Sequence, residues 1–146
     1  MRHRLKLKSE RGAALLETAL TLPLLLMVAV SIFEFGRAYQ TWQVLTNAAR
    51  EGARVAVLPN APTSASKARV EAYLQSGQLA EWEKASTTQT TVSIDIGGGA
   101  TAPASQVTVS YPFAFIVLQP VAQLLVKGST VGGPLSMTAS AVMRNE

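Results

Sequence analysis

Residues 13–33 are mostly apolar and contain one charged side chain, the acid Glu17. Residues 18–33 carry no formal charge, and counting from Ala13 extends the apolar run to twenty-one residues with Glu17 inside it. At about 1.5 Å per residue, such a helix measures roughly 31 Å and crosses a hydrocarbon core of about 30 Å. The pattern therefore predicts a transmembrane helix over residues 13–35.

Beyond the apolar run the pattern becomes amphipathic over residues 36–58. Small and apolar residues recur there at spacings of three or four, which predicts that the helix continues with one inward face. This face consists of Ala38, Trp42, Leu45, Ala49, Gly52, Ala53 and Ala56. The smallest residues of this face are Ala49, Gly52, Ala53 and Ala56. These small residues allow close approach either of the chain's own sheet, which we favour, or of a second subunit's helix.

The remaining residues, 59–146, predict a small head. Pro59 and Pro62 are expected to end the long helix near Leu58, and a short helix follows over residues 64–77. Alternation then predicts three strands, in the stretches TTVSIDI, SQVTVSYPFAF and LSMTASAVMR. The fold class is α+β, a long N-terminal helix packed on a small antiparallel sheet of about three strands.

The connections and strand details give further expectations. GGGATAP reads as the loop between the first two strands, and an apolar helix or loop near Pro120 precedes the last one. Val92, Ile94 and Ile96 alternate with polar residues and are expected on a buried face. Pro112 has no N–H to donate, which weakens the second strand as a central one.

The charge of the chain is concentrated before the apolar run. Residues 1–12 hold five Lys or Arg and one Glu, whereas the rest holds eight basic and eight acidic side chains. A surface that neutralises phosphates would persist in the folded body, so this balance argues against a nucleic-acid partner. A basic leader over residues 1–12 is expected to hold that end in the cytoplasm, so the rest of the chain is expected on the far side of the membrane.

The chain lacks the residues that most catalytic and metal sites need. It contains no Cys and one His, His3 in the leader, so the usual zinc and iron ligands and Ser–His or Cys–His pairs are missing. The glycines at 97–99 are not followed by the Lys-Ser/Thr of a phosphate loop. We therefore expect no catalytic residue, no metal and no cofactor, and predict that the protein is not an enzyme.

Glu17 separates three interpretations of the apolar run. A cleaved secretory signal needs a small-x-small site, which AVSIFEFGRAYQ does not offer. An uncleaved anchor explains the charges and the length but leaves Glu17 as a cost of a few kcal/mol. In the third, KSERGAALLE resembles a type IV prepilin signal, cut after Gly12 by a membrane peptidase that exposes the amine of Ala13. Glu17 would then pair with the ammonium group of an adjacent subunit.

Longer segments resemble the TadE-like pseudopilins of the tight-adherence (Flp-type) pilus machinery. They are RGAALLETALTLPLLL, FEFGRAYQTWQVLTNAAREGARVAV and, weakly, SMTASAVMRNE. The resemblance covers most of residues 11–58 and implies a pilin-like fold and a minor pilin or pseudopilin in pilus assembly, adhesion or secretion. The partners it implies are a prepilin peptidase, other pilin or pseudopilin subunits, the inner-membrane assembly platform and the lipid bilayer.

The resemblance also assigns roles to individual residues. The cleavage site falls between Gly12 and Ala13, and Glu17 is the assembly residue. Pro23 is expected to kink the helix, either harmlessly or as a hinge between bilayer and filament packing. The alternative function is an uncleaved single-pass envelope protein whose head binds a partner, and N-terminal sequencing separates the two at Ala13 or Met1.

Overall fold

The computed structural model describes residues 6–145, so part of the predicted leader, with His3, lies outside the described residues. The described chain divides into two compact units, and the helix α1 contributes to both. The first unit holds the chain up to Gly36 together with Phe115–Gly133. The second holds Arg37–Ala114 and the chain from Pro134 onwards.

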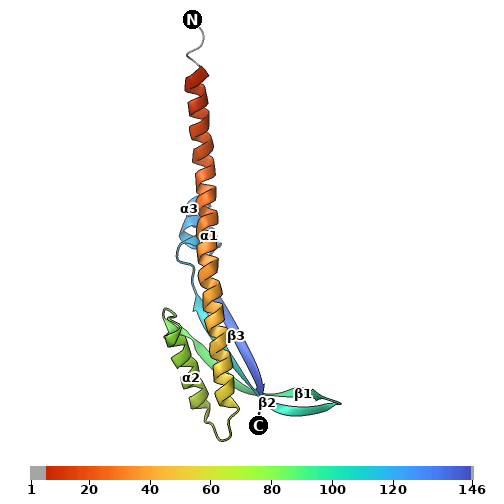
Figure 1. Cartoon of the computed structure of the whole chain (residues 1–146). Coiled ribbons are helices and arrows are strands. Elements are labelled where there is room, and N and C mark those ends of the chain that lie inside the picture. Colours follow the sequence, from red (N-terminus) through yellow and green to blue (C-terminus); the bar gives the residue numbers. More distant parts are fainter. Residues whose placement is uncertain (1–5, 146) are drawn as a thin grey trace. The chain divides into compact units, whose positions relative to one another are not determined.

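The elements follow the predicted order (Figure 1). They are α1 (Lys6–Ala56), α2 (Thr63–Ser76), a 3-10 turn η1 (Trp82–Lys84), β1 (Ser86–Gly97), β2 (Ala100–Phe113), α3 (Leu118–Leu125) and β3 (Leu135–Arg144). The three strands form one sheet in the order β1-β2-β3, with both pairs antiparallel. The predicted α+β class, a long helix with a three-stranded antiparallel sheet, is confirmed.

Helix α1 is continuous over 51 residues and contains Pro23 as an internal proline. The hydroxyl groups of Thr18 and Thr21 donate to the carbonyls of Ala14 and Glu17, each at 2.9 Å. Such bonds to the preceding turn satisfy polar side chains locally, which a helix in hydrocarbon requires. The hinge at Pro23 stays a prediction, because continuity of the helix does not test a later change of packing.

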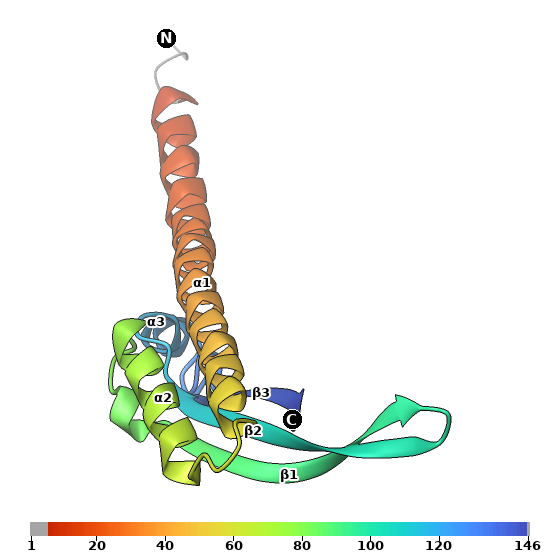
Figure 2. The same ribbon diagram turned by 60° about the horizontal axis from the view of Figure 1, so that its bottom comes forward.

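The second unit has a small core between the end of α1, α2 and the sheet (Figure 2). Its largest fully buried apolar side chains are Leu45, Leu74, Val70, Val107 and Val109. Helix α2 presents an apolar face at a spacing of four, and α1 presents its small residues, so the two helices can both reach β2. The sequence places this core correctly because helical and strand periodicities both mark the inward positions.

The central strand β2 corrects two expectations. Residues 100–103, expected in a loop, belong to β2, and the expectation that Pro112 disfavours a central strand is wrong. The β2–β3 ladder ends at Ala104, one residue from Pro103, and the β1–β2 ladder ends at Ser110, two residues from Pro112. Each proline therefore lies where β2 has a partner on only one side, and there a missing N–H costs little.

The burial expected for β1 is only partly observed. Its inward residues do alternate with exposed ones, but Val92 and Ile94 are half-buried and Ile96 is 49% exposed. The reason is that β3 pairs with β2 only from Ala104 onward, so the far end of the β1–β2 hairpin extends beyond the third strand (Figure 2). The tip of the hairpin has strand pairing without a core.

Candidate functional site in the long helix

The N-terminal part of α1 is the one helix in the described chain that is long and apolar enough to cross a membrane. Most of its large side chains are exposed. They include Leu15, Leu16, Leu20, Leu24, Leu25 and Ile32. A continuous apolar surface of this size is out of place in water and is what a single-pass membrane anchor presents to lipid.

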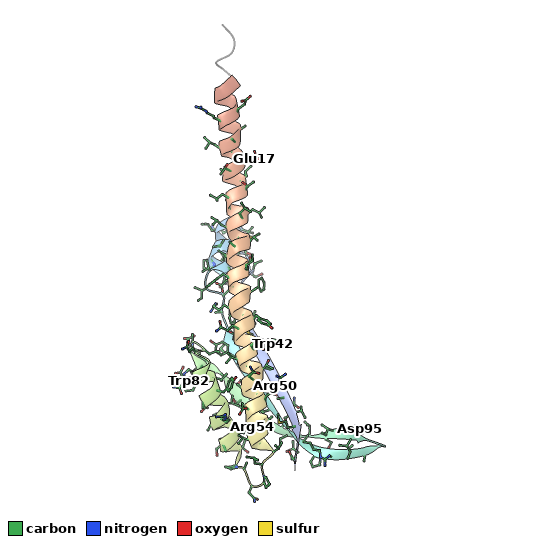
Figure 3. The ribbon with its side chains drawn as sticks, in the orientation of Figure 1. Glu17, Trp42, Arg50, Arg54, Trp82 and Asp95 are labelled. Carbon is green, nitrogen blue, oxygen red and sulfur yellow. The ribbon has the colours of Figure 1, made fainter. Side chains whose placement is uncertain are left out.

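The residues predicted for processing and assembly lie together on this exposed stretch. Gly12, Ala13 and Glu17 are all exposed, and a Cβ added at Gly12 would meet no atom within 4 Å. Figure 3 labels Glu17 among the apolar side chains of this part of α1. Within the described residues, the carboxylate of Glu17 has no hydrogen bond or ion pair. The structure therefore leaves these positions accessible, and their roles stay predictions.

Sequence analysis missed the most elaborate site of the first unit, at Glu34. This side chain is 0% exposed, and its Oε1 accepts the backbone N–H groups of Ile116 and Val117 at 2.8 and 2.6 Å. Val117 is the residue before α3, so the carboxylate satisfies two backbone N–H groups of the chain that leads into that helix. The sequence pattern indicates only that Glu34 ends the uncharged run, and nothing in it points to this contact.

Further contacts hold residues 115–133 to α1. The ring of Phe35 meets that of Phe115 edge to face, with ring centroids 6.1 Å apart. On α1, Met27, Val30 and Ser31 are half-buried at helical spacing before Glu34, whereas their neighbours are exposed. Because residues 115–133 are the rest of this unit, they are what covers this stripe of α1.

The small residues of α1 are occupied within the second unit. A Cβ added at Gly52 would come within 2.5 Å of Cγ2 of Val70 on α2 and 3.1 Å of Cγ1 of Val107 on β2. The Gly52 carbonyl also accepts a hydrogen bond from Oγ of Ser66 at 2.9 Å. Ala49 and Ala53 are fully buried beside it, and Ala56 is half-buried. This face therefore serves the close approach of α2 and β2.

One member of the predicted face points elsewhere. Trp42 is 46% exposed and lies beside Tyr39, with ring centroids 6.3 Å apart, whereas Thr41 is 8% exposed and takes the inward position. One residue turns a helix by about 100°, so an inward stripe moves to the neighbouring residue without losing its period. Spacing alone could not distinguish the two.

Charged side chains of the second unit tie its elements together near the surface. Oε2 of Glu51 on α1 accepts from Arg54 at 3.1 Å and from Arg69 of α2 at 3.0 Å. These bonds, first that of Arg69 and then that of Arg54, hold the pKa of Glu51 below its usual value. Among the described residues no group of acidic, histidine or cysteine side chains could hold a metal ion.

A second polar contact joins η1 to the sheet. The hydroxyl of Tyr111 on β2 donates to the carbonyl of Ala80, and burial raises the pKa of Tyr111. The neighbouring Glu81 accepts from Lys84 at 2.6 Å, and this bond raises the pKa of Lys84. These contacts fix a loop against the sheet.

Comparison with known proteins finds a family similarity in the long helix. Residues 12–54 match the family model described as TadE-like protein. This stretch is similar to TadE-like proteins. The matched residues lie entirely within α1 and include Gly12, Glu17, Glu34 and Gly52. No curated protein and no solved structure gives a significant match. The match supports involvement in a tight-adherence pilus system.

Proposed function

We propose that this chain is a minor pilin or pseudopilin subunit of a tight-adherence pilus and acts in its assembly. In the proposal, residues 1–12 are the cytoplasmic leader, residues 13–35 span the inner membrane, and residues 36–58 continue the helix to a periplasmic head at 59–146. The observation that carries it is Glu17, an acid without a partner in the described chain, on the exposed apolar part of a TadE-like helix.

A prepilin peptidase would cut this chain between Gly12 and Ala13. Both residues are exposed on α1, and the glycine has open space around its Cα, which allows the backbone to enter a narrow cleft. The cut removes a basic leader and leaves the apolar helix intact. It also creates an ammonium group at Ala13, one helical turn before Glu17.

The carboxylate of Glu17 would recognise that new ammonium group on an adjacent subunit. A carboxylate alone in hydrocarbon is costly, whereas a charge-assisted hydrogen bond to an amine makes its burial tolerable. Removing one member of such a buried pair typically costs about 3–5 kcal/mol. Subunits would therefore enter the assembly platform only after processing, and Pro23 would be the hinge for the change from bilayer to filament packing.

N-terminal sequencing of the membrane-extracted protein, from cells that carry a tight-adherence system, tests the cleavage. The proposal expects a chain that begins at Ala13, and a Gly12→Leu variant that keeps its leader. The uncleaved envelope protein that binds a partner through its head is the alternative, and it expects Met1 or Arg2 at the N-terminus. A functional protein that retains its leader overturns the proposal.

Sheared surface fractions test the role of Glu17. The Glu17→Ala variant is expected to insert and be processed normally but to be absent from the sheared pilus fraction. Glu10→Ala is the matched control, because this exposed acid on the same helix is removed with the leader. Normal recovery of Glu17→Ala in the pilus fraction contradicts the assembly role.

A further inference from the structure

The segment around α3 exposes an apolar surface that the proposed function does not use. Its exposed apolar residues next to and on α3, here called the α3 apolar face, are Ile116, Val117, Leu124 and Val126. Leu124 is 86% exposed on a helix whose other side buries Leu118 and Ala122. In the whole of Phe115–Gly133 the one charged residue is Lys127. An exposed apolar patch of this kind marks a surface that binds a partner or a membrane.

The contacts of Glu34 decide where this surface lies along α1. Glu34 directly follows the uncharged run of residues 18–33, close to the end of the predicted span at residue 35, and its carboxylate accepts from the N–H groups of residues 116 and 117. The half-buried stripe then runs back along α1 from Glu34 to Met27. Seven residues of helix correspond to about 10 Å. Residues 115–133 therefore lie beside the last two turns of the span.

We propose that residues 116–126, with the α3 apolar face outward, insert into the outer leaflet of the bilayer beside the membrane-spanning part of α1. The ligand of this surface is lipid, at the boundary between acyl chains and headgroups. Amphipathic helices that bind there reach about 5–10 Å into the membrane, which agrees with the length of the covered stripe. The inference rests on α1 crossing the membrane and is independent of cleavage and of pilus assembly.

Two features fit lipid better than water or a protein partner. Backbone N–H groups at membrane depth need partners within the protein, and Glu34 supplies them at the point where the chain enters α3. Lys127 lies two residues after the end of α3, where its long side chain can reach the headgroups. The α3 apolar face belongs to the same compact unit as the exposed apolar residues of the span, and α3 lies beside α1 (Figure 1), so a bilayer that surrounds the span lies next to this face.

The absence of cysteine allows a direct measurement of depth. The full chain carrying Leu124→Cys, labelled with an environment-sensitive fluorophore, is reconstituted into phosphatidylcholine–phosphatidylglycerol vesicles with spin-labelled lipids. We expect emission shifted to the blue and quenched by a spin label near the headgroup. Leu20→Cys, in the middle of the span, should be quenched best by a deep label, and Thr88→Cys, exposed on β1, by neither.

A positioning test uses Glu34. Glu34→Ala should move the label at position 124 towards a water-like spectrum while leaving the label at position 20 unchanged, because only the tether of α3 is lost. Quenching at 20 with a water-like spectrum at 124 in the unmodified background overturns the inference and leaves the anchor standing. Absence of quenching at both positions overturns the anchor as well.

A second copy of the chain is the competing occupant of this surface. In that case the label at 124 would be shielded from water, resist quenching by lipid labels at every depth, and cross-link to itself with a yield that rises with the protein-to-lipid ratio. That result overturns the lipid assignment. Lipid quenching that is independent of the protein-to-lipid ratio supports it.

Discussion

The two parts of α1 have opposite patterns of side-chain burial although they form one helix. Over residues 15–33 most large apolar side chains are exposed, whereas over Arg37 to Ala56 the inward side chains are buried and, apart from Leu45, mostly small. The second part is satisfied by its own chain, since α2 and β2 approach it at Gly52. The first part needs an apolar surrounding that the chain supplies only between Met27 and Glu34. One part of α1 thus serves as a membrane anchor, and the other part belongs to the core of the second unit.

The sharpest test of this difference makes one substitution in both parts. Leu45→Ala removes a fully buried side chain and is expected to lower the free energy of unfolding of the second unit by about 2–5 kcal/mol. Leu20→Ala removes an exposed side chain and should leave that free energy unchanged. Urea unfolding of the full chain in detergent, followed by the fluorescence of Trp42 and Trp82, measures both. Equal effects would show that the two parts of α1 fold as one unit.

The next largest effect is expected at Glu34, where the two parts meet. Glu34→Ala leaves the part-buried N–H groups of Ile116 and Val117 without this acceptor, which costs at most about 1–3 kcal/mol for each group that finds no other partner. Amide hydrogen exchange should become faster over residues 115–133 and stay unchanged over β1 and β2.

Glu34→Gln is the matched variant, because its amide oxygen can still accept a hydrogen bond. It should show a smaller increase in exchange than Glu34→Ala. If both variants exchange like the parent, the carboxylate does not hold α3.

Much of the fold could be predicted because burial repeats with the period of each element. Leu45, Val70 and Leu74 mark the helices, and Val107 and Val109 mark the central strand, each by its local spacing. A three-residue glycine run marks the hairpin turn, where all three glycines have positive φ. Local patterns are therefore enough for element type and for most of the core.

The errors have one physical source, which is that local patterns do not contain long-range pairing. Glu34 meets backbone groups more than eighty residues away, so nothing near it in the sequence indicates its role. Pro103 and Pro112 are tolerated in β2 only because of where β1 and β3 end. The exposure of Ile96 depends on the same strand ends.

A smaller effect is expected from adding one methyl group to α1. At Gly52 the added Cβ would overlap Val70 and press on Val107, and overpacking of this kind typically costs about 1–3 kcal/mol. At Gly36 the added Cβ meets nothing within 4 Å, and Gly→Ala in a helix gains about 0.5–1 kcal/mol. Thermal unfolding should move in opposite directions for Gly52→Ala and Gly36→Ala. A shift of the same sign would mean that α2 yields at Val70.

The smallest effect concerns Glu51 and its two arginine partners, in the second part of α1 and on α2. The pKa of Glu51 is lowered because Arg69 and Arg54 hydrogen-bond its carboxylate, so the unfolded chain binds this proton more readily than the folded one. The stability it contributes is therefore present above the pKa of about 4.5 of a free glutamate and is lost as the pH falls through the lower folded value. Glu51→Gln should lower stability slightly at neutral pH and weaken the loss in acid. Glu71→Gln on α2, whose partner Lys67 is 3.8 Å away, removes the same charge and should change the acid profile less. Equal profiles for the two variants would mean that net charge, and not the contact of α1 with Arg69, sets the acid stability of this unit.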